Sequence, residues 1–432
     1  MNKNNTVLRF MTCGSVDDGK STLIGRLLYD TKTILTDTLS QIEKTSKKKG
    51  MTALDLSLIT DGLQAEREQG ITIDVAYRYF STGSRKYIIA DAPGHEQYTR
   101  NMVTAASTAQ LAIILVDARK GMLTQTRRHS YLTKLVGIKN IIVAVNKMDL
   151  VNYDENEYQN ICEEYNSFAS AIKLNKPEVN ISFIPMSALN GDMIVERGDS
   201  LSWYKGATLL ETLENIDTTE ETKNSRLRFP IQLVCRPRDS ANEALHDFRA
   251  FMGKIESGSL KVNDKIKVLP SSHESTIKEI RIGEELISEA NYEQSITVSL
   301  NDEIDISRGD MIVQKDDNLI STKKFTANVC WLSESNLNIN RTYLIMHTTR
   351  LSKAKISSIN NKININTLDA EQANELKTND IANINFKLAQ PLIVDQYEQN
   401  RSTGAFIIID ETTYHTVGAG MIETVEQYYK II

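Results

Sequence analysis

The chain has 432 residues, 41% of them hydrophobic and 25% charged, and a formal net charge of −6. These values are typical of a soluble globular protein with two or three domains, and the acidic balance gives no global field that attracts nucleic acid or anionic lipid. Its apolar runs are too short to cross a bilayer, and no signal peptide is expected. The four cysteines form no C-x-x-C pair. We therefore expect a cytoplasmic protein with reduced thiols.

In the first half of the chain, short apolar runs alternate with amphipathic segments. The runs at residues 85–91, 109–117 and 139–147 are continuous and each ends in a polar residue, as strands buried on both faces of a parallel sheet do. Helix-like stretches such as residues 126–135 lie between them. The pattern predicts a mostly parallel, doubly wound α/β domain over residues 1–217, with its ligand at the carboxyl ends of the strands.

Residues 7–13, V-L-R-F-M-T-C, form a predicted strand that leads into G-S-V-D-D-G-K-S, residues 14–21. The spacing G-x-x-x-x-G-K-S predicts a phosphate-binding loop, because Gly14 and Gly19 let successive backbone N–H groups turn toward phosphates. Lys20 can reach the β- and γ-phosphates, the Ser21 hydroxyl can bind Mg²⁺, and the helix starting near Gly19 directs its positive end at the anion. We predict nucleotide contacts from Gly14, Ser15, Val16, Asp17, Asp18, Gly19, Lys20, Ser21 and Thr22.

Two further segments are predicted to sense the γ-phosphate. D-A-P-G-H, residues 91–95, follows a predicted buried strand, so Asp91 can hold Mg²⁺ through water while the Gly94 N–H faces the γ-phosphate. In G-I-T-I-D, residues 70–74, Thr72 is expected to reach Mg²⁺ and the γ-phosphate when a switch loop closes. His95 stands where a Ras-like switch has a water-orienting glutamine, and histidine there is typical of translation-factor-type GTPases. We predict catalytic roles for Lys20, Thr72 and His95, and nucleotide contacts from Asp91, Ala92, Pro93, Gly94 and His95.

The base is predicted to be guanine. N-K-M-D, residues 146–149, ends an apolar strand, and the Asp149 carboxylate can accept from the base N1–H and N2–H₂, a pair that adenine does not offer. S-A-L, residues 187–189, resembles an element that supports the base through backbone N–H groups. The predicted ligand is therefore GTP and not ATP, with contacts from Asn146, Lys147, Met148, Asp149, Ser187, Ala188 and Leu189.

The second half of the chain is predicted to be β-rich. Residues 218–225 are polar and predict a linker. Residues 253–270 contain two alternating strands with turn residues, as hairpins and barrels do, and a further break falls near residues 315–324. We predict β-barrels over residues 226–318 and 323–432, which together with the first domain is an architecture similar to elongation factor Tu.

Four segments closely resemble the large, GTP-binding subunit of bacterial sulfate adenylyltransferase, within the translation-factor GTPase superfamily: residues 13–31, 65–80, 203–214 and 391–410. Elongation-factor loops commonly carry histidines where this loop has Ser15 and Asp18. An acid beside a triphosphate is unfavourable unless it points away, so this loop indicates a branch distinct from the elongation factors. One departure from the family is visible: residues 236–246 precede D-F-R, where the family runs almost directly from R-P into D-F-R, which puts in doubt any contact that the family makes there.

The resemblance implies a heterodimer in which a smaller subunit forms adenosine 5′-phosphosulfate and pyrophosphate from ATP and sulfate, while this subunit hydrolyses GTP to drive that reaction. Consistent with this division, the chain contains no H-x-G-H or S-G-G-x-D-S motif for adenylyl transfer. It also contains no second phosphate loop, which a fused adenylylsulfate kinase would need. Two alternatives remain at this stage: a translation GTPase that delivers aminoacyl-tRNA, and a GTP-regulated scaffold with negligible turnover, against which His95 and Thr72 argue.

Overall fold

The computed structural model describes residues 7–34, 37, 39, 42, 56–59, 74–95, 98–217, 225–236, 248–319, 321–364, 367 and 369–426. The chain forms two compact units, one from residues 1–218 and one from most of residues 219–432. Most of the predicted linker, residues 218–224, lies outside the described residues, and the predicted domain boundaries stay predictions. Within the described residues, no helix is long and apolar enough to cross a membrane.

The first unit contains a six-stranded sheet in the order β2-β3-β1-β4-β5-β6. All neighbouring strands are parallel except the edge strand β2, which runs antiparallel to β3. The strands are β1 (Val7–Cys13), β2 (Ala76–Ser81), β3 (Lys86–Asp91), β4 (Leu111–Asp117), β5 (Asn140–Asn146) and β6 (Asn180–Pro185). Every residue of β4 is buried, which explains its continuous apolar run. The predicted parallel-rich α/β domain is therefore confirmed.

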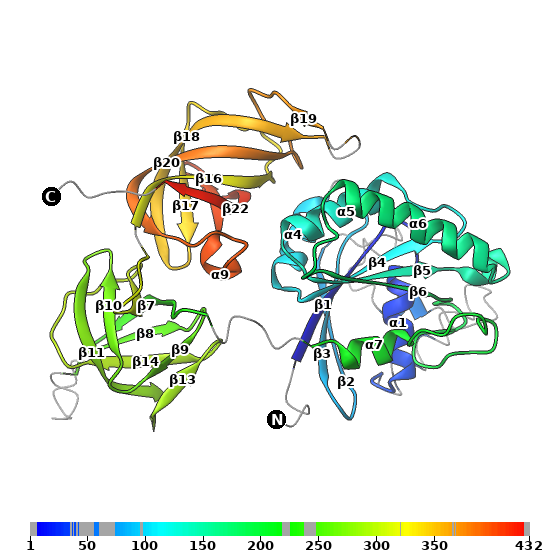
Figure 1. Ribbon diagram of the computed structural model, residues 1–432, viewed down its shortest axis with the longest axis horizontal. Helices are drawn as coiled ribbons and strands as arrows, with labels where there is room; N and C mark the ends of the chain where they lie inside the picture. The colour runs from blue at the N-terminus through cyan, green and yellow to red at the C-terminus, as the bar shows by residue number, and fades with distance from the viewer. Residues whose placement is uncertain are drawn as a thin grey trace. The chain divides into compact units, whose positions relative to one another are not determined.

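Helices cover both faces of this sheet. They are α1 (Lys20–Asp30), α4 (Thr99–Thr108), α5 (Thr124–Leu135), α6 (Glu155–Ala171) and α7 (Leu209–Asn215), with short 3₁₀ helices η2 (Leu56–Ile59) and η4 (Met148–Val151). Figure 1 shows α4, α5 and α6 on one face and α1 and α7 on the other. A capping box starts α7: Thr208 Oγ1 accepts from the Glu211 N–H at 3.2 Å, and Glu211 Oε2 accepts from the Thr208 N–H at 2.8 Å.

The second unit contains two seven-stranded sheets, and each closes by an additional strand pairing. In the first sheet β10 also pairs with β11, and in the second β17 also pairs with β18. The first group of strands comprises β7 (Phe229–Cys235), β8 (Ala250–Lys254), β9 (Ser259–Lys261), β10 (Lys265–Leu269), β11 (His273–Ile282), β12 (Glu285–Ile287), β13 (Glu289–Asn291), β14 (Ser295–Leu300) and β15 (Met311–Gln314). The second comprises β16 (Ser321–Trp331), β17 (Thr342–His347), β18 (Arg350–Ile363), β19 (Ala370–Glu371), β20 (Ile381–Ile393), β21 (Ala405–Asp410) and β22 (Thr416–Glu426), with the one-turn helix α9 (Arg401–Gly404).

Each barrel has its own apolar core, built around Phe229 and Phe251 in the first and around Trp331 and Phe386 in the second. Residues 253–270 do contain strands, but β9 and β10 do not form a hairpin with each other. Instead β9 pairs with β13, while β10 pairs with β11 and β15. Alternation of apolar residues fixes which face of a strand is buried, but it does not select the partner strand.

A buried arginine joins the two barrels. Arg228, just before β7, donates from Nε and Nη2 to the two carboxylate oxygens of Asp395 at 2.7 and 2.9 Å, and Asp395 follows β20. Its Nη1 donates to Asp317 Oδ2 at 2.7 Å, after β15. All three side chains are nearly inaccessible to solvent, so each charge depends on its partners.

Candidate nucleotide site

The predicted phosphate loop connects β1 to α1 at the carboxyl edge of the sheet. Gly19 caps the helix in a left-handed conformation, with φ of 95°. A Cβ at this position would lie 2.4 Å from Asn146 Nδ2, so only glycine fits. The buried Lys20 ammonium lies across the loop and donates to Gly14 O at 3.1 Å and to Ser15 O at 2.7 Å. The loop therefore has the curled shape that a phosphate cradle needs.

The charge on Lys20 favours an anionic ligand. Burial lowers the pKa of this ammonium, while the nearby carboxylates of Asp91 and Asp18 act in the opposite direction. A phosphate group would supply further negative charge next to an ammonium that burial disfavours. The buried Ser15 hydroxyl has no hydrogen-bond partner among the described residues, so the loop also retains an unused donor. These observations fit a nucleoside triphosphate.

The Asp18 side chain turns into the phosphate loop. Its side chain is only 1% exposed, and its Oδ2 accepts the Ser15 N–H at 2.6 Å from within the loop. Burial raises the pKa of this carboxyl, partly offset by Lys20. The residue that stands in place of an elongation-factor histidine thus occupies one of the backbone N–H donors of the loop from inside.

The D-A-P-G-H segment lies against the phosphate loop. Asp91, the last residue of β3, accepts a hydrogen bond from Thr12 Oγ1 at 3.2 Å. A Cβ at Gly94 would lie 2.5 Å from Lys20 Nζ and 2.7 Å from Gly14 O, so the two segments approach closely only because residue 94 is glycine. Ala92 and Pro93 of this segment are buried. Asp91 and Gly94 therefore lie beside Lys20.

The proposed catalytic group His95 is exposed, and its ring centroid lies 6.1 Å from that of Tyr98. Thr72 lies outside the described residues. Ser21 is in the first turn of α1, and within the described residues no group of three or more His, Cys, Asp or Glu could hold a metal ion. A Mg²⁺ held by the Ser21 hydroxyl, Asp91 through water and phosphate oxygens fits this donor set, because Mg²⁺ usually needs few protein ligands.

The predicted guanine elements are connected to the phosphate loop by one side chain. Asn146 Nδ2 donates to Asp18 O at 2.8 Å, and Asn146 Oδ1 accepts the Ala188 N–H at 2.9 Å. Ser187 Oγ donates to Asp149 Oδ1 at 2.6 Å, which fixes the orientation of that carboxylate. Met148 is fully buried and anchors the segment in the core. The structure thus brings the phosphate loop together with two motifs that lie more than a hundred residues further along the sequence.

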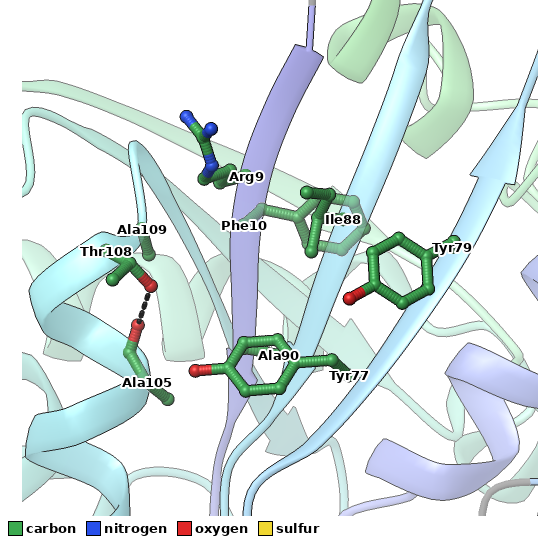
Figure 2. Close-up of a pocket in the computed structure, with 9 residues that line it drawn as sticks. All are labelled: Arg9, Phe10, Tyr77, Tyr79, Ile88, Ala90, Ala105, Thr108 and Ala109. Atoms are coloured by element: carbon green, nitrogen blue, oxygen red, sulfur yellow. Dashed lines mark hydrogen bonds between the residues drawn. The ribbon is translucent and has the colours of Figure 1, made fainter. Parts of the chain in front are cut away.

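Several partly exposed residues border the phosphate loop and the guanine elements. Val16, Asp17 and Thr22 are not fully buried, and Leu189 is 55% exposed beside the guanine elements. A groove of about 690 Å³ lies between the end of α1 and the segment after Leu189, lined in part by Asn190 and Gly191. A separate apolar pocket of about 260 Å³ lies beside α4, where Tyr77 and Tyr79 of β2 face it (Figure 2); no predicted site residue lines that pocket.

Sequence reasoning missed two sets of supporting residues. Arg26 of α1 donates from Nε to Ala188 O at 3.3 Å and from Nη2 to Leu189 O, and so holds the S-A-L element. Asp117, at the end of β4, binds both Arg119 and Lys147. The polar end of an otherwise apolar strand was the only signal for Asp117, and nothing in the sequence indicated Arg26.

Comparison with known proteins agrees with these features. Residues 5–220 match the family described as elongation factor Tu GTP binding domain, and residues 324–423 match the family described as GTP-eEF1A C-terminal domain-like. Relatives named sulfate adenylyltransferase subunit 1 from Aliarcobacter butzleri and Colwellia psychrerythraea are 52% and 51% identical over 97% of this chain and 88% of their own length. The protein of that name from Cellvibrio japonicus is 49% identical over 96% of this chain and 86% of its own.

Solved structures of Sup35 complexed with GDP and with GMPPNP align with 98% and 99% of this chain and 94% and 96% of theirs. Each has 21% sequence identity and a TM-score of 0.44.

Proposed function

Because the chain belongs to the family of sulfate adenylyltransferase subunit 1, with a GTP-binding domain of the elongation factor Tu type, we propose that it hydrolyses GTP to drive a partner subunit's chemistry. The partner is a smaller subunit that forms adenosine 5′-phosphosulfate and pyrophosphate from ATP and sulfate. The family name implies a second subunit, and the absence of adenylyl-transfer motifs from this chain supports placing that reaction on the partner.

The observation that carries this proposal is the hydrogen-bonded connection of Ser15, Asp18, Asn146 and Ala188. It joins the phosphate loop to both guanine elements, so one nucleotide can contact all three at once. None of the observations favours delivery of aminoacyl-tRNA, and the relatives that match nearly the whole chain carry the name of the sulfate enzyme.

In this site Lys20 would bind the β- and γ-phosphates, and Asp149 would bind the guanine base. Ser21 and Asp91 would hold Mg²⁺, which neutralises charge on the phosphates when it is bound. His95 would orient the attacking water. Thr72 would contact the γ-phosphate and so close the switch region. The switch acts on the partner only if the partner binds the GTP state of this chain better than its other states.

The exposed His95 provides a test of the hydrolysis step. We expect His95→Ala to leave GTP affinity nearly unchanged and to lower kcat by about 10²-fold, because a water-orienting group acts in the transition state. Single-turnover hydrolysis and nucleotide titration measure the two quantities separately. His415→Ala, another exposed histidine, is the matched control. Equal turnover in the parent and His95→Ala would remove His95 from the mechanism.

The coupling test measures GDP and pyrophosphate release in parallel, with each subunit omitted in turn. Alone, this chain is expected to hydrolyse GTP slowly and to form no adenosine 5′-phosphosulfate. Addition of the small subunit should raise hydrolysis, ATP and sulfate should raise it further, and product should exceed its GTP-free equilibrium. Thr72→Ala should uncouple the two reactions, while Ser167→Ala, an exposed hydroxyl on α6, should not.

Two results would contradict this scheme. Formation of adenosine 5′-phosphosulfate by this chain alone would overturn the division of labour between the subunits. A chain that ignores the small subunit and sulfate, but responds to ribosomes and aminoacyl-tRNA, would instead belong functionally with the translation GTPases.

A further inference from the structure

A charged cluster lies at the end of β4, next to the guanine elements but outside the predicted contacts. The Asp117 side chain is fully buried. Arg119 donates to it twice, from Nε to Oδ1 at 3.0 Å and from Nη2 to Oδ2 at 2.7 Å, and the Arg119 backbone N–H adds a third bond at 3.0 Å. Lys147 Nζ lies 3.0 Å from Asp117 Oδ2. The carboxylate is therefore held in one plane by a bidentate fork, with one oxygen directed at Lys147.

Lys147 has a second anchor on the phosphate loop. It adopts a left-handed conformation, with φ of 63°, and its ammonium also donates to Asp17 O. The Lys147 ammonium thus joins the end of β4 to the phosphate loop. The backbone of Lys147 directly follows that of Asn146 at the end of β5. The ends of β4 and β5 are also tied directly, since the Ala118 N–H donates to Asn146 O at 2.9 Å.

This cluster differs from an ordinary surface ion pair. Exposed pairs contribute little because water screens them, whereas this carboxylate is buried. Burial acts to raise its pKa, but the hydrogen bonds from Arg119 and Lys147 hold the pKa of Asp117 well below its usual range, so the group stays charged. Arg119 is 44% exposed and Lys147 is 22% exposed, so neither cation fills the core. The Asp117 carboxylate therefore serves to hold the Lys147 side chain rather than to pack the core of the sheet.

We propose that Asp117 and Arg119 are positioning residues for the guanine nucleotide: they hold Lys147 across the phosphate loop and thereby slow nucleotide dissociation. Loss of one partner from a buried charge pair acts mainly on the dissociation rate. The inference rests on guanine-nucleotide binding at this site, and it does not depend on coupling to sulfate activation.

The test measures dissociation of a fluorescent GDP analogue by stopped flow. We expect Asp117→Asn to raise the dissociation rate by about tenfold or more, because a hydrogen bond to a charged group is lost. Arg119→Ala should raise it less, and Arg119→Lys should restore part of the difference. At saturating GTP, kcat should fall less than the dissociation rate rises. Arg127→Ala, which breaks the exposed pair with Glu164, is the matched control and should dissociate like the parent.

A double-mutant cycle with Lys147→Ala decides whether Lys147 is the target. If the inference holds, Asp117→Asn and Arg119→Ala raise the dissociation rate of the GDP analogue only slightly when Lys147→Ala is already present. Additive effects, or parent-like dissociation in both single variants, would overturn it. Should Asp117→Asn fail to fold, the cycle of Arg119→Ala with Lys147→Ala carries the same test, because both side chains are partly exposed. A parent chain that does not bind the GDP analogue would reject the nucleotide site itself, whereas failed coupling to the small subunit would leave this inference intact.

Discussion

Lys20→Ala is expected to weaken both GTP and GDP binding by about 10³-fold, because it removes the buried cation that faces the phosphates. In the free protein this ammonium donates to the loop carbonyls of Gly14 and Ser15. Titration with a fluorescent nucleotide measures the loss directly.

The unfolding temperature of the nucleotide-free variant shows whether the chain still folds, because Lys20 also donates to Gly14 O and Ser15 O within the loop. Lys176→Ala, which removes an exposed partner of Glu178, controls for general loss of positive charge. Nucleotide affinity within tenfold of the parent's would show that Lys20 does not bind the phosphates.

Asp149→Asn should shift preference from GTP to XTP. Ser187 Oγ donates to Asp149 Oδ1, so an asparagine here would present its carbonyl oxygen to Ser187 and its amide NH₂ to the base. That NH₂ can donate to the carbonyl that xanthine carries in place of the guanine amino group. GTP binding should weaken by about 2–4 kcal/mol, since a charge-assisted pair is lost and donors are left unpaired.

Competition of GTP and XTP for a fluorescent nucleotide measures this change. Asp199→Asn, an exposed acid of the same unit, should keep the parent's preference for GTP. If Asp149→Asn binds GTP as tightly as the parent, the assignment of this strand end to the base is wrong.

Local motifs located most of the candidate site because each one combines a backbone shape with the side chain that uses it. Gly19 and Lys20 are adjacent in sequence, and so are Pro93 and Gly94. Placement of Asn146 near the phosphate loop followed from a general rule, that parallel strands end at one edge of the sheet. The strand predicted at residues 7–13 has those bounds in the structure, and the helix predicted to start near Gly19 begins at Lys20.

Contacts between distant side chains could not be predicted in this way. Arg26 reaches Ala188 only because the end of α1 packs beside the segment after β6. The pairing of Asp117 with Lys147 depends on the left-handed backbone conformation of Lys147. It also depends on the turn after β4, which brings the Arg119 side chain back to Asp117. The spacing of apolar residues in the sequence carries no information about the Arg26 contact or about the Asp117 pair. The insertion at residues 236–246 falls almost entirely outside the described residues, so its effect stays a prediction.

The arginine shared by the two barrels limits how the second half of this chain can be recombined with relatives. A chimaera that exchanged only the last barrel for one without an acid at the place of Asp395 would leave the Arg228 guanidinium buried with half of its partners. Breaking a buried pair in this way costs about 3–5 kcal/mol, a large share of the stability of a typical domain. The two barrels should therefore be exchanged, and inherited, as a single cassette.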